Sequence, residues 1–140
     1  MTKYYGVGTW WNKDKEQHYK EFIDGKKACI STILDKPTKR ENENRKKFRE
    51  IFLSIHKKNI IYLKVYDILN QKFRIRAVGT VKANPQNNNL DCIYCVGINY
   101  HSNHNFDGLK DFNDGVKRNT RIYQETNIEV IRFIDSILQI

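Results

Sequence analysis

The sequence predicts an α+β fold in which a small, mostly antiparallel, curled sheet is flanked by two or three helices. Two runs of β-branched and aromatic residues, 60–66 and 73–81, carry this prediction, because turn-forming residues 67–71 join them into a hairpin. A third run, residues 90–100, is expected to lie antiparallel to the second. Sheets of five or six short strands tend to curl into barrels.

Side chains on the second strand of this hairpin should alternate between two faces. One face is expected to carry Phe73, Ile75, Ala77, Gly79 and Val81, and the other to carry Arg74, Arg76, Val78 and Thr80. A glycine inside a strand indicates a bulge or the close approach of another backbone or a ligand, and Gly79 holds such a position.

The first third of the chain predicts two short strands with a helix between them. The strands cover residues 4–11 (YYGVGTWW) and 27–32. The helix covers residues 16–24 and turns Tyr19, Phe22 and Ile23 inward, and Gly25 suits its C-terminal cap.

The strongest helix signal spans residues 38–56. Thr38 and Glu41 fit a capping box, in which each side chain satisfies an amide at the helix start. An apolar stripe at helical spacing follows, made of Phe48, Ile51, Phe52 and Ile55. The opposite face carries Lys39, Arg40, Arg45, Lys46 and Arg49. Such a face is usually only solvated, and contact with nucleic acid is the functional alternative.

The C-terminal part predicts a loop, a short strand and a closing helix. Residues 84–89 and 101–116 are polar and irregular, and a short strand runs through residues 120–123. The helix begins at Asn127, with Ile128, Ile131, Ile134 and Leu138 along one side. No composition shift marks a boundary, so residues 1–140 are expected to form one domain.

The formal net charge of +9 points to an acidic partner, with nucleic acid first. The excess is uneven, because residues 1–60 carry 15 Lys and Arg against 8 Asp and Glu, whereas residues 61–140 carry 10 against 8. The alternative is that an AT-rich genome enriches lysine, which then only solvates the surface.

The thiol and metal chemistry predicted from the sequence is sparse. We expect a cytoplasmic protein with no membrane span, since residues 1–11 lack the apolar core of a signal peptide. Cys29, Cys92 and Cys95 are therefore expected to be free thiols. Cys92 and Cys95, followed by two histidines, are ligand types for zinc, but on one strand they face opposite ways, so no metal or cofactor is predicted.

Aromatic residues in polar settings are the most informative feature. Trp10 and Trp11 end the first strand, and Tyr94 and Tyr100 share a face of the third. Such rings stack on nucleobases or enclose methylated groups, the alternative being that each belongs to the core. No nucleophile, phosphate-loop or metalloprotease motif is present, so we expect a binding protein and no enzyme.

Residues 58–66 (KNIIYLKVY) and 74–81 (RIRAVGTV) resemble the paired strands of the EVE group in the PUA-like superfamily, which is related to YTH domains. Residues 94–100 resemble the following strand and residues 128–138 the closing helix. The usual Gly-Asp of the family is Lys58-Asn59 here, and its expected tryptophan near the end of the third strand is replaced by Ile98-Asn99-Tyr100.

This resemblance implies a PUA-like pseudo-barrel with a pocket that reads a modified or flipped base, as in relatives that read methylated RNA or DNA or act as sensors in bacterial defence. By position, the pocket would be lined by Gly8, Thr9, Trp10, Trp11, Ser31, Thr32, Asn99 and Tyr100. Phosphates would be held by the five basic helix residues together with Arg74 and Arg76. The alternative is a module of a defence or counter-defence system that binds a small nucleotide or signal, or a protein.

Overall fold

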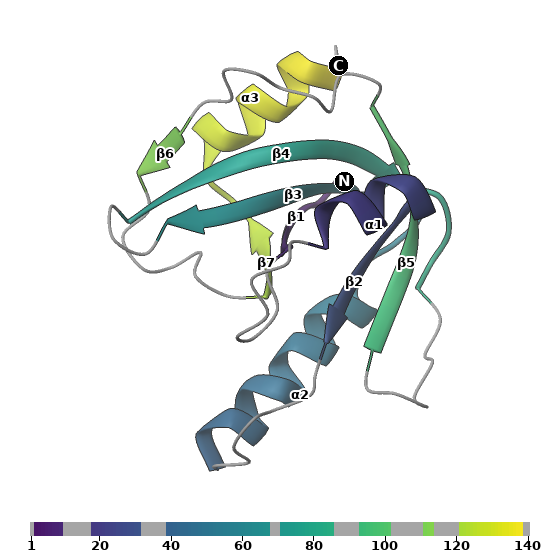
Figure 1. Ribbon diagram of the computed structural model, residues 1–140, viewed down its shortest axis with the longest axis vertical. Coiled ribbons are helices and arrows are strands. Elements are labelled where there is room, and N and C mark those ends of the chain that lie inside the picture. Colours follow the sequence, from purple (N-terminus) through teal and green to yellow (C-terminus); the bar gives the residue numbers. More distant parts are fainter. Residues whose placement is uncertain are drawn as a thin grey trace.

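The computed structural model describes residues 2–9, 18–31, 39–67, 71–85, 93–101, 111–113 and 121–138. Figure 1 shows the elements within these ranges, which in chain order are β1 (Tyr4–Gly8), α1 (Tyr19–Gly25), β2 (Lys27–Ser31), α2 (Lys39–Leu53), β3 (Ile60–Asp67), β4 (Lys72–Val81), β5 (Ile93–Tyr100), β6 (Asp111–Asn113), β7 (Ile122–Glu125) and α3 (Ile128–Leu138). The predicted α+β class, with a curled sheet and three helices, is confirmed.

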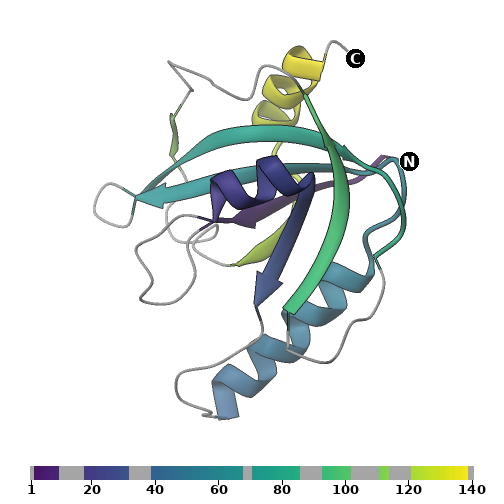
Figure 2. The ribbon, with the colours of Figure 1, turned by 45° about the vertical axis from the view of Figure 1, so that its right-hand side comes forward.

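The strands form one sheet in the order β2-β5-β4-β3-β1-β7, and β6 pairs with β4 beside this path. β1 runs parallel to β3, while the other described pairs are antiparallel, so the sheet is mixed. Figures 1 and 2 show that β4 is long and arched, and that β5 and β2 turn away from the plane of β3 and β4. The sheet therefore has the form of a half-barrel.

Two hydrophobic cores lie on opposite faces of the sheet. In the inner core, Phe22 of α1 and Phe52 of α2 pack against β1, β2 and β5. The ring centroids of Phe52 and of Tyr94 on β5 lie 6.0 Å apart. The outer core packs Val130 and Ile134 of α3 against β3 and β4. Figure 1 shows this division, with α3 on one side of the arch and α1 and α2 on the other. The predicted apolar stripe of α2 and the inward face of α1 both contribute to the inner core.

A β-bulge in β4 changes the predicted alternation of side chains. Leu63 pairs with Ala77 and Lys64 with Ile75, so Arg76 is the additional residue of the bulged strand. One inserted residue reverses the faces on either side of it. Ile75 consequently joins the outer core and Ala77 the inner core, and the prediction that they share a face is wrong.

Gly79 marks a close approach of β5. A Cβ atom added there would lie 2.4 Å from the Ile98 side chain and 2.8 Å from the carbonyl oxygen of Asn99, so only glycine fits. The close approach predicted at Gly79 is confirmed, and the bulge lies three residues before it.

Three smaller predictions need correction. The residue that ends α1 in a left-handed conformation is Lys26, with φ of 50°, and its amide donates to Ile23. α3 packs Ile134 and Leu138 against the outer core as predicted, but Val130 is also buried there, whereas Ile128 is 56% exposed. The segment expected to be irregular contains β6, which pairs with the exposed end of β4.

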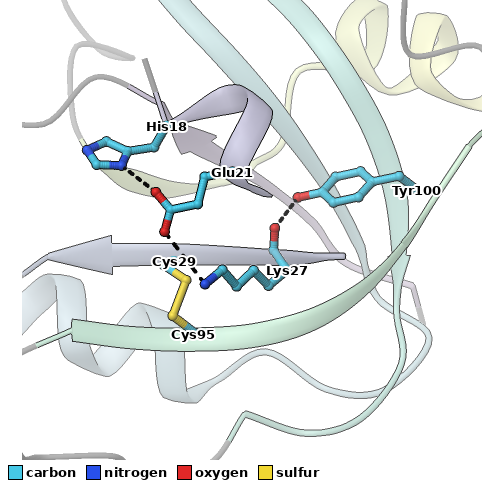
Figure 3. Close-up of polar contacts among 6 residues, drawn as sticks. All are labelled: His18, Glu21, Lys27, Cys29, Cys95 and Tyr100. Carbon is cyan, nitrogen blue, oxygen red and sulfur yellow. Dashed lines mark hydrogen bonds and ion pairs between the residues drawn. A yellow bond between two sulfur atoms is a disulfide. The ribbon is translucent and has the colours of Figure 1, made fainter. Parts of the chain in front are cut away.

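β2 and β5 are joined by a disulfide bond, which corrects the prediction of free thiols. Cys29 and Cys95 occupy paired positions in the register, with their Cα atoms 4.1 Å apart, and their sulfur atoms are bonded. Figure 3 shows the bridge between the two strands. Cys92 lies outside the described residues. In the part of the chain that the structure describes, no helix is long and apolar enough to span a membrane.

Candidate nucleic-acid interface

The bulge in β4 directs Arg76 toward α1, where it stacks on an aromatic ring. The guanidinium carbon of Arg76 lies 4.2 Å from the centroid of the Tyr19 ring, and the Tyr19 hydroxyl donates to the Arg76 carbonyl oxygen at 3.5 Å. A guanidinium at this distance over a tyrosine face forms a cation–π contact. Burial raises the pKa of Tyr19, and the neighbouring Arg76 partly opposes this increase.

Two further cations lie on the same face of β4. Phe73 and Ile75 point into the outer core, so Lys72 and Arg74, which alternate with them, point to the inner face like Arg76. Lys72 and Arg74 are exposed, and Arg76 is partly exposed. We call Tyr19, Lys72, Arg74 and Arg76 the arginine–tyrosine face. It combines three basic residues with one aromatic plane, and the register pairs Lys72 with Asp67 and Arg74 with Asp111.

Tyr100, at the end of β5, connects β5 to β2 near Tyr19. Its hydroxyl donates to the carbonyl oxygen of Lys27 at 2.7 Å, and its ring packs against the inner core (Figure 3). Burial raises the pKa of Tyr100, and the nearby Tyr19 adds to this increase. Tyr100 therefore anchors the end of β5 to the start of β2.

A short polar chain lies between α1 and β2. His18 Nδ1 is 2.9 Å from Glu21 Oε2, and Lys27 Nζ is 3.6 Å from Glu21 Oε1, as Figure 3 shows. The hydrogen bond with His18 lowers the pKa of Glu21, although partial burial opposes it, and Lys27 lowers it further. These contacts fix α1 over the start of β2 and so help to hold Tyr19 in place.

The residues predicted to line one pocket are divided by the fold. Thr9 is fully buried and its hydroxyl donates to the Lys64 carbonyl oxygen at 3.3 Å, so, contrary to the sequence prediction, it is not available to a base edge. Gly8 ends β1 beside Lys64. Asn99 is exposed, whereas its neighbour Tyr100 packs into the inner core, so their side chains face opposite ways.

Ser31 lies away from Tyr100. Ser31 pairs with Ile93, while Lys27, which binds the Tyr100 hydroxyl, pairs with Gly97 at the other end of β2. Lys27 and Ser31 are four residues apart along β2, or roughly 13 Å. Trp10, Trp11 and Thr32 lie outside the described residues.

The predicted phosphate contacts fall into two groups. Arg74 and Arg76 belong to the arginine–tyrosine face, and Lys46 and Arg49 are exposed on α2. Lys39, Arg40 and Arg45 lie in α2, but their side chains are outside the described part of the structure. Within the described ranges, no group of three or more His, Cys, Asp or Glu residues could hold a metal ion. Cys95 is also committed to its disulfide bond.

Sequence reasoning assigned Tyr19 to the core and so missed its stacking with Arg76. The helix and the strand are separated by 57 residues, and the contact depends on the bulge, which no local signal marked. No protein-family model matches the chain, and comparisons with curated proteins and with solved structures return no match.

Proposed function

We propose that this protein is a non-catalytic nucleic-acid-binding module that uses the arginine–tyrosine face. The stacking of Arg76 on Tyr19 at 4.2 Å, beside the exposed Arg74 and Lys72, carries this proposal. Guanidinium groups bind phosphate through paired hydrogen bonds, and an aromatic face accepts a base by stacking. The net charge of +9 adds long-range attraction to a polyanion.

Recognition of a modified or flipped base is a finer part of the same proposal. It rests on the resemblance to the EVE group and on Trp10 and Trp11, which directly follow the buried Thr9 in the chain. Flipping a base costs a few kcal/mol, and stacking on aromatic rings returns about 1–3 kcal/mol per base. A role in a prokaryotic or phage defence system would agree with that resemblance.

A cytoplasmic location also belongs to the proposal, and the Cys29–Cys95 bond gives it a direct test. Disulfides persist in oxidising compartments and are rare in the reducing cytosol. The structure contains this bond, so a cytoplasmic location requires that the cytosol reduces it to two thiols. Alkylation of thiols in freshly lysed cells, followed by mass measurement, should label both residues, and an intact disulfide would overturn this location.

Binding should be tested by titrating labelled single- and double-stranded oligonucleotides, with and without methylated bases, at two salt concentrations. The double variant Arg74→Gln/Arg76→Gln should reduce the slope of log K against log salt by about 1.4–1.8, because each phosphate contact contributes about 0.7–0.9. Lys47→Gln/Arg132→Gln removes equal charge from exposed positions on α2 and α3 and is the matched control.

The aromatic part needs its own pair of variants. Tyr19→Phe keeps the ring and should bind like the wild type, whereas Tyr19→Leu should lose about 1–3 kcal/mol of binding free energy. Failure of the wild type to bind any oligonucleotide at low salt would overturn the proposal. Thermal shifts with free nucleotides would then indicate the alternative, a small-molecule sensor, because a ligand raises the melting temperature by mass action.

A further inference from the structure

Four exposed lysines gather at the end of the sheet opposite the arginine–tyrosine face. They are Lys3, Lys57, Lys58 and Lys82, and we call them the lysine edge. Lys3 precedes β1, Lys57 and Lys58 precede β3, and Lys82 follows β4. Figure 2 shows the N-terminus beside the connection from α2 to β3.

Backbone hydrogen bonds hold these segments side by side. The Lys58 amide donates to the Val81 carbonyl oxygen at 3.0 Å, and the Val81 amide donates to the Asn59 carbonyl oxygen at 2.8 Å, so Lys58 and Asn59 both lie opposite Val81, the residue before Lys82. The Ile60 amide donates to the Lys3 carbonyl oxygen at 3.0 Å. The lysine edge therefore crosses the ends of three neighbouring strands, β4, β3 and β1.

No acidic side chain balances this charge in the described part of the chain. Among the described residues, none of the four lysines forms an ion pair. Like charges gathered in one region repel one another and destabilise the compact state. Lys58 also has φ of 75°, in the left-handed region that glycine or asparagine occupies at lower cost. Charge is thus concentrated here against both electrostatic and backbone preference, which points to an anionic ligand.

The lysine edge continues toward the arginine–tyrosine face across β5 and β2. The Lys82 amide donates to the Gly97 carbonyl oxygen at 3.0 Å, and Gly97 pairs with Lys27 on its other side. The aliphatic part of the Lys82 side chain lies over Gly97. Because Gly97 has no side chain, no bulk separates Lys82 from Lys27 at this position. Lys27 in turn belongs to the polar chain beside Tyr19.

We propose that the lysine edge is a second phosphate-binding site, which holds the backbone of the same nucleic acid that the arginine–tyrosine face binds. The choice of nucleic acid as the polyanion rests on the proposed function. A membrane surface is disfavoured because Leu53 and Ile128 are the exposed large apolar residues in the described part, and neither belongs to the lysine edge.

The separation of the two sites sets a minimum ligand length. Lys82, which directly follows β4, lies six residues beyond Arg76, which corresponds to about 20 Å of extended chain. Phosphates of one strand advance about 3.4 Å each along a duplex, so roughly six of them span this separation. Shorter oligonucleotides can occupy one site, and longer ones can occupy both.

The test compares binding of labelled oligonucleotides of 4, 8, 12 and 20 nucleotides by fluorescence anisotropy. The lysine-edge variant is Lys57→Gln/Lys58→Asn/Lys82→Gln, in which asparagine suits the left-handed position. Its matched control, Lys20→Gln/Lys47→Gln/Arg132→Gln, removes the same charge from exposed positions on α1, α2 and α3. Thermal melts of each variant check folding, and the lysine-edge variant should melt no lower than the wild type.

For the wild type, affinity should rise steeply between 4 and 12 nucleotides. In the lysine-edge variant this rise should be lost, and the salt slope for 20-mers should fall by about 2–3, well beyond the control. Equal losses in variant and control would overturn the second site while leaving the arginine–tyrosine face intact. If the lysine-edge variant lost binding to phosphatidylserine vesicles while its oligonucleotide binding stayed unchanged, the second nucleic-acid site would be overturned in favour of a membrane surface.

Discussion

The Tyr62 hydroxyl donates a 2.7 Å hydrogen bond to Glu125, a carboxylate that is itself only 3% exposed. The other carboxylate oxygen of Glu125 accepts the amides of Thr126 and Asn127 at 3.1 Å each, at the start of α3. The Tyr62 and Tyr123 hydroxyls are also hydrogen-bonded to each other. One buried acid thereby joins β3, β7 and the helix that covers the outer core.

Replacing Glu125 should destabilise the protein strongly. Glu125→Ala leaves buried donors without an acceptor and should lower the free energy of unfolding by about 2–3 kcal/mol, while Glu125→Gln, which keeps an acceptor oxygen, should cost less. Urea denaturation measures both. Glu129→Ala, an exposed acid four residues later, is the control and should cost at most about 1 kcal/mol. Equal losses at the two positions would contradict a central role for Glu125.

Stability should decline at high pH partly through Tyr4. Its hydroxyl donates to Asp135 at 2.6 Å, and burial together with this carboxylate raises the pKa of Tyr4 to about 12. The folded state therefore favours the protonated tyrosine. Its contribution is complete below the ordinary pKa of 10 and is lost as pH rises through 12. Thermal melts from pH 9 to 12 should show a shallower decline for Tyr4→Phe, and parallel curves for the two proteins would refute this assignment.

Breaking the Cys29–Cys95 bond should lower stability. The two cysteines are separated by 66 residues, and the chain-entropy model gives about 4 kcal/mol for a loop of this length. Cys29→Ala/Cys95→Ala should melt at a lower temperature than the wild type. Dithiothreitol should lower the melting temperature of the wild type but not that of this double variant. Cys92→Ala should keep the response to dithiothreitol, and a variant insensitive to it would implicate Cys92 in the bridge.

The paired tryptophans should differ in effect, because neighbours on a strand point to opposite sides. We expect Trp11→Ala to cost roughly 3–5 kcal/mol of stability as a core residue. Trp10→Ala should leave stability nearly unchanged and weaken oligonucleotide binding by about 1–3 kcal/mol. Calorimetry and anisotropy on each variant separate the two effects. Two equally unstable variants would assign both rings to the core.

The elements were predictable where hydrophobic periodicity is strong, as in the hairpin of β3 and β4 and the apolar stripe of α2, which ends in Phe52 and is followed by Ile55 just beyond the helix. The face to which each β4 side chain points was not predictable, because the bulge at Arg76 reverses the alternation of side chains and no glycine marks its position. The contact of Tyr19 with Arg76 depends on how α1 lies over the sheet, which local patterns do not encode. The disulfide was missed because pairing depends on which strands become neighbours.

The lysine edge had a usable signal. The predicted hairpin brings the residues that precede its first strand beside those that follow its second, which places Lys57 and Lys58 near Lys82. The Lys57–Lys58 doublet stands between a helix and a strand, where turn residues are common. Its contact with Lys3 could not be inferred, because it requires the parallel pairing of β1 with β3.

The position of β1 has a consequence for biosynthesis. Tyr4 pairs with Ile60 on one side and with Glu125 on the other, so both edges of this early strand wait for partners that emerge much later from the ribosome. At about 5–20 residues per second, the interval between the emergence of β1 and that of β7 is roughly 6–24 s. Throughout that time at least one edge of β1 lacks its partner, and β1 contains Tyr5 and Val7, both fully buried in the finished protein. Those seconds are when a chaperone, or a neighbouring nascent chain, has access to it.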